Sequence, residues 1–215
     1  METLVLIGLG VGCAVLLGVL VYRVAFSPRA RGRRALERTP RLPIGEIRQG
    51  EMVKVIGHVR FATKSLRPPM TDDRPCVCWH LRVQEARQGA QGGSWTDVLD
   101  EVEGQDFLLE DETGVALVRG VMPEATLASS GPWIDNYVDD FRPVVEEFLG
   151  GQGEQVRGAL GKRVMRYQER ILDDGARVAV LGIARQEGVL ESANVVIDCL
   201  DDGRIVISNV PSALR

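Results

Sequence analysis

The closest grouping of chemically versatile side chains is Cys76-x-Cys78-x-His80, in the segment CVCWHLRV at residues 76–83. On a β-strand these three side chains would share one face, with neighbours roughly 7 Å apart at ~3.3 Å rise per residue. Tetrahedral zinc, bound at ~2.0–2.3 Å, needs ligands closer together and a fourth ligand from elsewhere, such as His58 or Cys199. A nucleophile pair of Cys78 and His80 meets the same difficulty, because neighbours at i and i+2 rarely hydrogen-bond. We therefore favour buried, metal-free thiols and keep Cys76, Cys78 and His80 as the candidate metal ligands.

Further catalytic signatures are missing from the sequence. It has no P-loop, no G-x-S-x-G, no H-E-x-x-H and no dinucleotide-binding glycine pattern, and it contains only two histidines. The paired acids at 72–73, 139–140, 173–174 and 201–202 are typical of solvated turns. We expect no cofactor and favour a protein that is not an enzyme by itself.

Charge is distributed unevenly along the chain. Residues 1–44 hold seven arginines and two glutamates, a formal +5, whereas residues 45–215 hold the remaining 19 basic and 28 acidic residues, a formal −9. An acidic domain on a basic segment argues against nucleic acid as a partner. Three cysteines outside the first 44 residues cannot all pair within one chain, so reduced thiols in the cytoplasm are expected.

The amino-terminal segment has the character of a membrane anchor. Residues 3–22, TLVLIGLGVGCAVLLGVLVY, carry no charge and as a helix would span ~30 Å, the thickness of the hydrocarbon core. A cleaved signal peptide is the alternative, but the preceding Met-Glu-Thr lacks the usual basic residues. All seven arginines of this region follow the run, so the positive-inside rule predicts a single-pass membrane protein with its carboxyl-terminal domain in the cytoplasm.

The residues after the anchor form a basic neck. We divide the chain into an anchor (1–26), a juxtamembrane neck (27–43) with at most one helical turn, and a folded domain (44–215). The neck arginines either mark topology only or also contact anionic headgroups, and the candidates for headgroup contact are Arg29, Arg31, Arg33 and Arg34. Gly8 and Gly12 have the spacing that allows two membrane helices to approach closely, so they are the candidate dimer contact.

The domain pattern predicts a mostly β fold. Alternating or β-rich segments occur at 52–61, 76–83, 106–111, 115–120, 164–172, 177–186 and 204–210, and the periodicity turns helical only between 133 and 160. We expect an OB-like small barrel or curled sheet with one or two helical insertions. The pattern Gly50-x-x-Val-x-Val-x-Gly57 recurs as Gly175-x-x-Val-x-Val-x-Gly182, either as a true repeat or as a coincidence of a short pattern. Gly175 should have positive φ in a tight hairpin turn, and the second glycine of each copy should mark a bend or a close backbone approach. Glu112-Thr113-Gly114 predicts a second tight hairpin, between 106–111 and 115–120.

The order of these segments resembles the GIDE domain, also called BAM for "beside a membrane". The resemblance rests on an ordered set of segments: the apolar span, the basic neck, and then GEMVKVIGHV, RPCVCW, FLLEDETG and YQERILDDGARVAVLG. It covers about residues 45–210 of the folded domain. This domain occurs in membrane-anchored ubiquitin ligases of the MULAN/MAPL type and in many bacterial proteins without the ligase part. The resemblance implies a bacterial, membrane-proximal scaffold whose motif positions are Arg74, Pro75, Cys76, Asp111, Thr113, Gly114, Glu169 and Gly175.

The predicted function is a non-catalytic interaction or scaffold domain of the GIDE type with an unknown protein partner. Transfer from the family would instead suggest a RING-type ubiquitin transferase. That activity needs eight zinc ligands in paired spacings, and no C-x-x-C pair follows Cys78. Two competing hypotheses are a hydrolase with an unrecognised site and an OB-like ligand-binding barrel.

Overall fold

The computed structural model of the protein describes residues 28–70, 74–86, 94–119, 123–126, 134–137, 164–185, 193, 195–201 and 203–215. The predicted anchor at 3–22 lies outside these ranges. Within them, no helix has both the length and the apolar character needed to cross a membrane.

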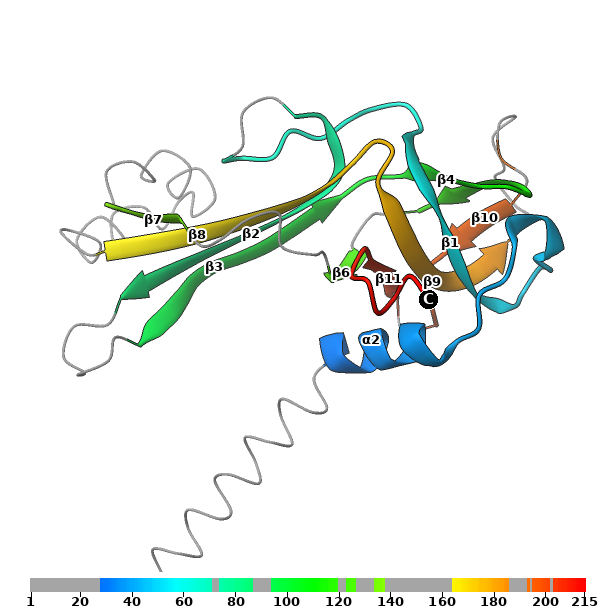
Figure 1. Cartoon of the computed structure of the whole chain (residues 1–215), viewed down its shortest axis with the longest axis horizontal. Helices are drawn as coiled ribbons and strands as arrows, with labels where there is room; N and C mark the ends of the chain where they lie inside the picture. Colours follow the sequence, from blue (N-terminus) through cyan, green and yellow to red (C-terminus); the bar gives the residue numbers. More distant parts are fainter. Residues whose placement is uncertain are drawn as a thin grey trace, which may run out of the picture.

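A closed five-stranded barrel organises the fold, and this confirms the mostly β prediction (Figure 1). Its strands are β1 (Met52–Phe61), β4 (Phe107–Asp111), β5 (Gly114–Val118), β10 (Val195–Asp198) and β9 (Arg177–Arg185). They follow one another around the barrel in that order, and pairing of β1 with β9 closes it. The β5–β10 pair is parallel, whereas the other four pairs are antiparallel.

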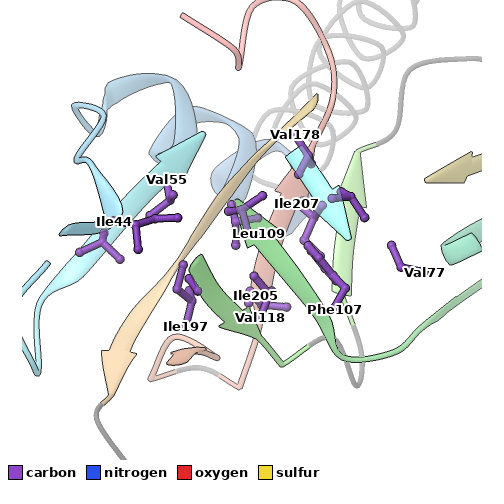
Figure 2. Close-up of a cluster of buried hydrophobic side chains, with 14 of the residues drawn as sticks. Ile44, Val55, Val77, Phe107, Leu109, Val118, Val178, Ile197, Ile205 and Ile207 are labelled. Atoms are coloured by element: carbon purple, nitrogen blue, oxygen red, sulfur yellow. The ribbon is translucent and has the colours of Figure 1, made fainter. Parts of the chain in front are cut away.

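The barrel interior is an apolar core. Alternate residues of β1 and β9, such as Val55 and Val178, point inward and meet Phe107, Leu109 and Ile197 (Figure 2). All five are fully buried. The barrel is therefore held by the inward half of each alternating strand, as the sequence pattern predicts.

Two further strands extend the barrel sheet. Strand β11 (Ile205–Ser208) pairs with β9, and β6 (Pro123–Thr126) pairs in parallel with β11. The strand predicted at 204–210 is thus present over Ile205–Ser208.

A second, four-stranded antiparallel sheet extends away from the barrel (Figure 1). Its order is β3 (Trp95–Gly104), β2 (Cys76–Ala86), β8 (Val164–Asp173) and β7 (Ile134–Tyr137). Strand β8 leads through a tight turn into β9, so one continuous chain path joins the two sheets. The predicted helical periodicity from 133 is wrong at Ile134–Tyr137, because pairing with the edge of β8 outweighs the local helical pattern. Residues 138–160 lie outside the described ranges.

The recurring glycine pattern is a structural repeat. The two copies are paired with each other in β1 and β9, with Val53 opposite Gly182 and Gly57 opposite Val178. The first glycine of each copy has positive φ, 83° at Gly50 and 77° at Gly175. Each donates its backbone N–H to a carbonyl oxygen of the other strand at 2.8 Å, Gly50 to Ala184 and Gly175 to Val59. The positive φ expected of such a turn glycine is confirmed at Gly175.

The second glycine of each copy lies where its strand changes neighbours. A Cβ at Gly57 would come within 2.5 Å of the Glu110 carbonyl oxygen, and one at Gly182 within 2.5 Å of the Asp198 carbonyl oxygen. Beyond these points β1 pairs with β4 and β9 pairs with β10. The predicted close backbone approach at Gly182 is therefore confirmed, and it is what lets one strand serve two neighbours around a small barrel.

The neck contains a longer helix than predicted. Helix α2 (Pro28–Arg38) has 11 residues, three turns where the sequence suggested at most one. Pro28 occupies the first helical position, where its missing N–H costs nothing, and Pro40 ends the helix because the residue before a proline disfavours helical geometry. The prolines therefore delimit a helix and do not interrupt one.

Helix α2 packs against the outside of the barrel. Leu36 is fully buried there, in a cluster with Ile56, Leu181, Val206 and Ala213. This contact makes the neck helix part of the folded unit.

Candidate functional site

The three candidate metal ligands do not share a face, so the prediction that they do is wrong. Strand β2 has a bulge between Cys76 and Cys78, since Cys76 pairs with Asp173 and Cys78 pairs with the adjacent Leu172. Cys78 therefore joins the barrel core and Cys76 joins a separate cluster with Trp79. A bulge inserts one residue and reverses the alternation beyond it, which the residue types do not reveal.

Both thiols are chemically protected. Burial, with smaller contributions from nearby acidic groups, raises the pKa of Cys76 to about 12, and burial raises the pKa of Cys78 to about 12 as well. Neither is a thiolate near neutral pH, so neither is an activated nucleophile. His80 is directed elsewhere, with its Nε2 2.6 Å from Asp100 Oδ1. Among the described residues no group of three Cys, His, Asp or Glu side chains is placed to hold a metal ion.

The motif residues Asp111, Thr113 and Gly114 form an anchor for the incoming chain. Asp111 Oδ2 accepts the backbone N–H of Ile44 at 3.0 Å, and Thr113 Oγ1 accepts that of Gly45 at 2.9 Å. These donors begin the short 3-10 helix η1 (Ile44–Glu46), whose N–H groups otherwise lack partners. The turn thus fixes the segment that carries Ile44 into the barrel core.

The charge on Asp111 is set by its surroundings. Burial alone would raise the pKa of this carboxyl group, but hydrogen bonds from the Thr113 hydroxyl and from the backbone N–H groups of Ile44, Thr113 and Gly114 together lower it. The carboxylate form is therefore the one that the native turn stabilises.

The remaining motif positions lie near the junction of the two sheets. Glu169, almost fully buried on β8, accepts the backbone N–H of Met70 at 2.9 Å and so secures the loop before β2. Cys76 pairs with Leu66 at the start of that loop, and Gly175 forms the β8–β9 turn. The exposed members of the motif are Arg74, Pro75, Thr113 and Gly175. Most motif positions therefore hold the architecture together. Thr113 and Gly175 do so from the surface, whereas Arg74 and Pro75 are exposed without such a task among the contacts described above.

A groove opens on the barrel surface at the point where β1 leaves β9 for β4. We call it the fork groove; it encloses about 500 Å³ and is lined by Arg41, Ile56, Gly57, His58, Arg60, Glu110, Asp111, Glu112 and Arg177. A volume of this size is ordinary for a ligand site. Sequence reasoning missed this groove, and its only sequence signal is that His58 follows the bend glycine Gly57.

Charges in the fork groove are partly satisfied. Arg60 pairs with Glu110 at 3.1 Å and with Asp174 at 3.7 Å, and Asp111 accepts backbone N–H groups. In the described part of the chain, Arg41, His58 and Arg177 are exposed and have no acidic partner. The groove therefore offers two guanidinium groups and an imidazole to an anionic group, beside the exposed carboxylate of Glu112. Its described lining contains no Ser, Thr, Cys or Lys side chain.

The predicted headgroup arginines separate into different environments. Arg33 Nε donates to Glu37 Oε1 at 3.0 Å, so it is already paired. Arg31 and Arg34 are exposed, and the side chain of Arg29 lies outside the described part. Nearby, Lys54 is only 2% exposed and its Nζ donates to the Arg215 carbonyl oxygen at 2.9 Å. Nothing in the sequence pattern singles out Lys54 for this burial.

Comparison with known proteins leaves the family open. The chain matches no family profile, no curated protein and no solved structure. The resemblance to the GIDE domain accordingly enters below as part of a proposal.

Proposed function

We propose that this protein is a membrane-anchored, cytoplasm-facing interaction domain of the GIDE type, without catalytic activity of its own. The observation that carries the proposal is the position of α2 between the apolar run and the barrel. Only five residues separate Tyr22, the last residue of the run, from Pro28, a path of at most about 20 Å. Because α2 packs against the barrel through Leu36, an anchor at 3–22 would hold the barrel beside the bilayer.

The chemistry of the domain supports a binding role. Its motif carboxylates are occupied by backbone N–H groups, and its two strand thiols are buried and protonated. The fork groove, in contrast, presents Arg41, His58 and Arg177 at the surface. We infer that the groove receives an acidic side chain or a terminal carboxylate of a partner protein.

The barrel supports a second candidate function, that of an OB-like ligand-binding domain. When its strands are numbered along the chain as first to fifth, their order around the barrel is first, second, third, fifth, fourth, with the third and fifth parallel. This is the arrangement we would assign to an OB-like barrel, a type that binds oligonucleotides or oligosaccharides. The formal −9 of residues 45–215 makes nucleic acid the less favoured ligand.

A ubiquitin-ligase-like activity is the competing function suggested by the family resemblance. RING domains require bound zinc, so metal content discriminates between a ligase and an interaction domain. Zinc bound at about one equivalent or more, together with ubiquitin transfer, would favour the ligase over the interaction domain.

Two experiments test the main proposal. A reporter fused after Arg215 should behave as cytoplasmic, and the chain should resist extraction from membranes at high pH. A pull-down from native membranes should then recover a partner with the parent chain and not with His58→Glu/Arg177→Glu. Arg119→Gln/Arg185→Gln is the control, since these arginines pair with Asp198 and lie outside the groove. Exposure of the carboxyl terminus on the opposite side, or equal recovery with all three chains, would contradict the proposal.

A further inference from the structure

Helix α2 has two opposite faces. At 100° per residue, the positions of Arg31, Arg34 and Arg38 lie within about 40° of the direction opposite Leu36. Leu36 and Gly32 are buried against the barrel, whereas these three arginines are exposed. We refer to Arg31, Arg34 and Arg38 as the arginine face.

The arginine face is not satisfied by the protein. In the described part of the chain none of its three guanidinium groups has an acidic partner, although Glu37 lies on the same helix. Glu37 instead accepts a hydrogen bond from Arg33, and this bond is the largest cause that lowers the pKa of Glu37. The helix therefore pairs its one acidic side chain with a different arginine and leaves three cations facing outward.

A groove with apolar walls continues from the arginine face. It encloses about 490 Å³ and is lined by Ala35, Arg38, Thr39, Pro40, Arg41, Leu42, Met52 and Val53. Met52 is 57% exposed, the one large hydrophobic side chain in the described part that is so exposed. Two guanidinium groups at the rim of an apolar groove match a molecule with an anionic head and a hydrocarbon tail.

We propose that the arginine face and the groove at Met52 bind the headgroups and upper acyl chains of anionic phospholipids, and so fix the barrel against the bilayer surface. The inference rests on the proposed anchor, because α2 follows it by so few residues that the helix must lie close to the headgroups. It replaces the predicted headgroup set of Arg29, Arg31, Arg33 and Arg34 with Arg31, Arg34, Arg38 and Arg41, and it adds an apolar contact at Met52. An acidic protein partner would satisfy the arginines but would not require the bilayer, and the test separates the two.

The test uses the full chain in nanodiscs of neutral phosphatidylcholine, or of phosphatidylcholine with phosphatidylserine. Met52→Cys in a Cys13→Ala/Cys199→Ser background places an environment-sensitive fluorophore at the groove, because Cys76 and Cys78 are buried. We expect higher emission in the anionic discs, reversed by high salt. Neutralising Arg34 and Arg38 to Gln should reduce the ratio of docked to undocked chains about 25-fold, since each arginine near an anionic surface contributes about fivefold.

The control is Arg119→Gln/Arg185→Gln, an equal change of charge outside both the arginine face and the fork groove, which should leave the emission unchanged. As a check without the fluorophore, tryptic cleavage in α2 should be slower in anionic than in neutral discs. Equal emission and equal cleavage in both lipids would overturn the inference while leaving the anchor intact. Failure of the chain to incorporate into discs at all would instead overturn the proposed function.

Discussion

The glycine repeat makes a quantitative prediction, because the same residue type performs two different tasks in each copy. Gly50 and Gly175 have positive φ but room for a Cβ. A Cβ added at Gly50 would have no non-neighbouring atom within 4 Å, and one added at Gly175 would have only Arg60 Nη1, at 3.8 Å. Gly57 and Gly182 do not have positive φ, but a Cβ added at either position would lie 2.5 Å from a backbone carbonyl oxygen. Alanine substitution should therefore expose strain at the first pair and a steric clash at the second.

The two costs differ in size. Placing alanine in a left-handed conformation costs about 1–2 kcal/mol, and asparagine tolerates it better. A Cβ at Gly182 must push β10 away, which combines overpacking, about 1–3 kcal/mol, with weakening of the three-residue β9–β10 pairing, about 1 kcal/mol per hydrogen bond. We expect Gly50→Ala and Gly175→Ala to cost about 1–2 kcal/mol, and Gly57→Ala and Gly182→Ala about 3 kcal/mol or more.

The assay is denaturant unfolding of residues 28–215, with the midpoint and slope compared across the four alanine variants. Gly175→Asn is the control, and it should recover most of the stability that Gly175→Ala loses. Equal losses at Gly175 and Gly182, or no rescue by asparagine, would refute the assignment of strain to one pair and clash to the other. A large difference between Gly57→Ala and Gly182→Ala would show that the two copies are not equivalent.

Three further predictions concern the helix, the turn and the thiols. Leu36→Ala should destabilise residues 28–215 by about 2–4 kcal/mol in thermal or denaturant melts, because the side chain is fully buried, and a fragment starting at Pro43 should be less stable for the same reason. Asp111→Asn should remove stability at neutral pH but little at acid pH: the folded pKa of Asp111 is lowered, so its contribution is present above the unfolded pKa and disappears as pH falls through the folded pKa. In native protein at pH 8, a maleimide should modify Cys199 and spare Cys76 and Cys78, whose exposed fractions are 0% and 1%. Rapid labelling of all three thiols would contradict the buried positions. A zinc chelator should change neither the labelling nor the melting curve.

Local patterns were sufficient for seven of the strands but did not predict β3, β6, β7 or β10. The alternating residues of 52–61 and 177–186 predict β1 and β9, and the Glu112-Thr113-Gly114 turn predicts the β4–β5 hairpin. These predictions succeeded because a strand that buries one side must alternate, and a tight turn needs particular residue types. The same local information predicted the positive φ of Gly175.

Local patterns failed where a neighbour in space decides the outcome. Residues 134–137 form a strand because β8 offers an edge, and the thiols of β2 separate because a bulge follows from pairing with β8. The fork groove likewise depends on tertiary pairing. His58 and Arg177 meet when β1 pairs with β9, and Arg41 joins them through its bridge to Lys54 on β1.

The sequence by itself determined the mostly β class, the positions of seven strands, the basic neck and the paired glycine pattern, since each depends on short-range periodicity, composition or turn chemistry. Only the tertiary structure decided what those residues do. It joined the two glycine copies across one antiparallel pair, closed five strands into a barrel, occupied Asp111 with the N–H groups of the incoming chain, and turned three arginines away from the side of α2 that Leu36 buries. The physical reason is that burial and pairing involve partners distant in sequence. Whether a charged side chain stabilises the fold or stays available for binding depends on which groups the fold places in contact with it.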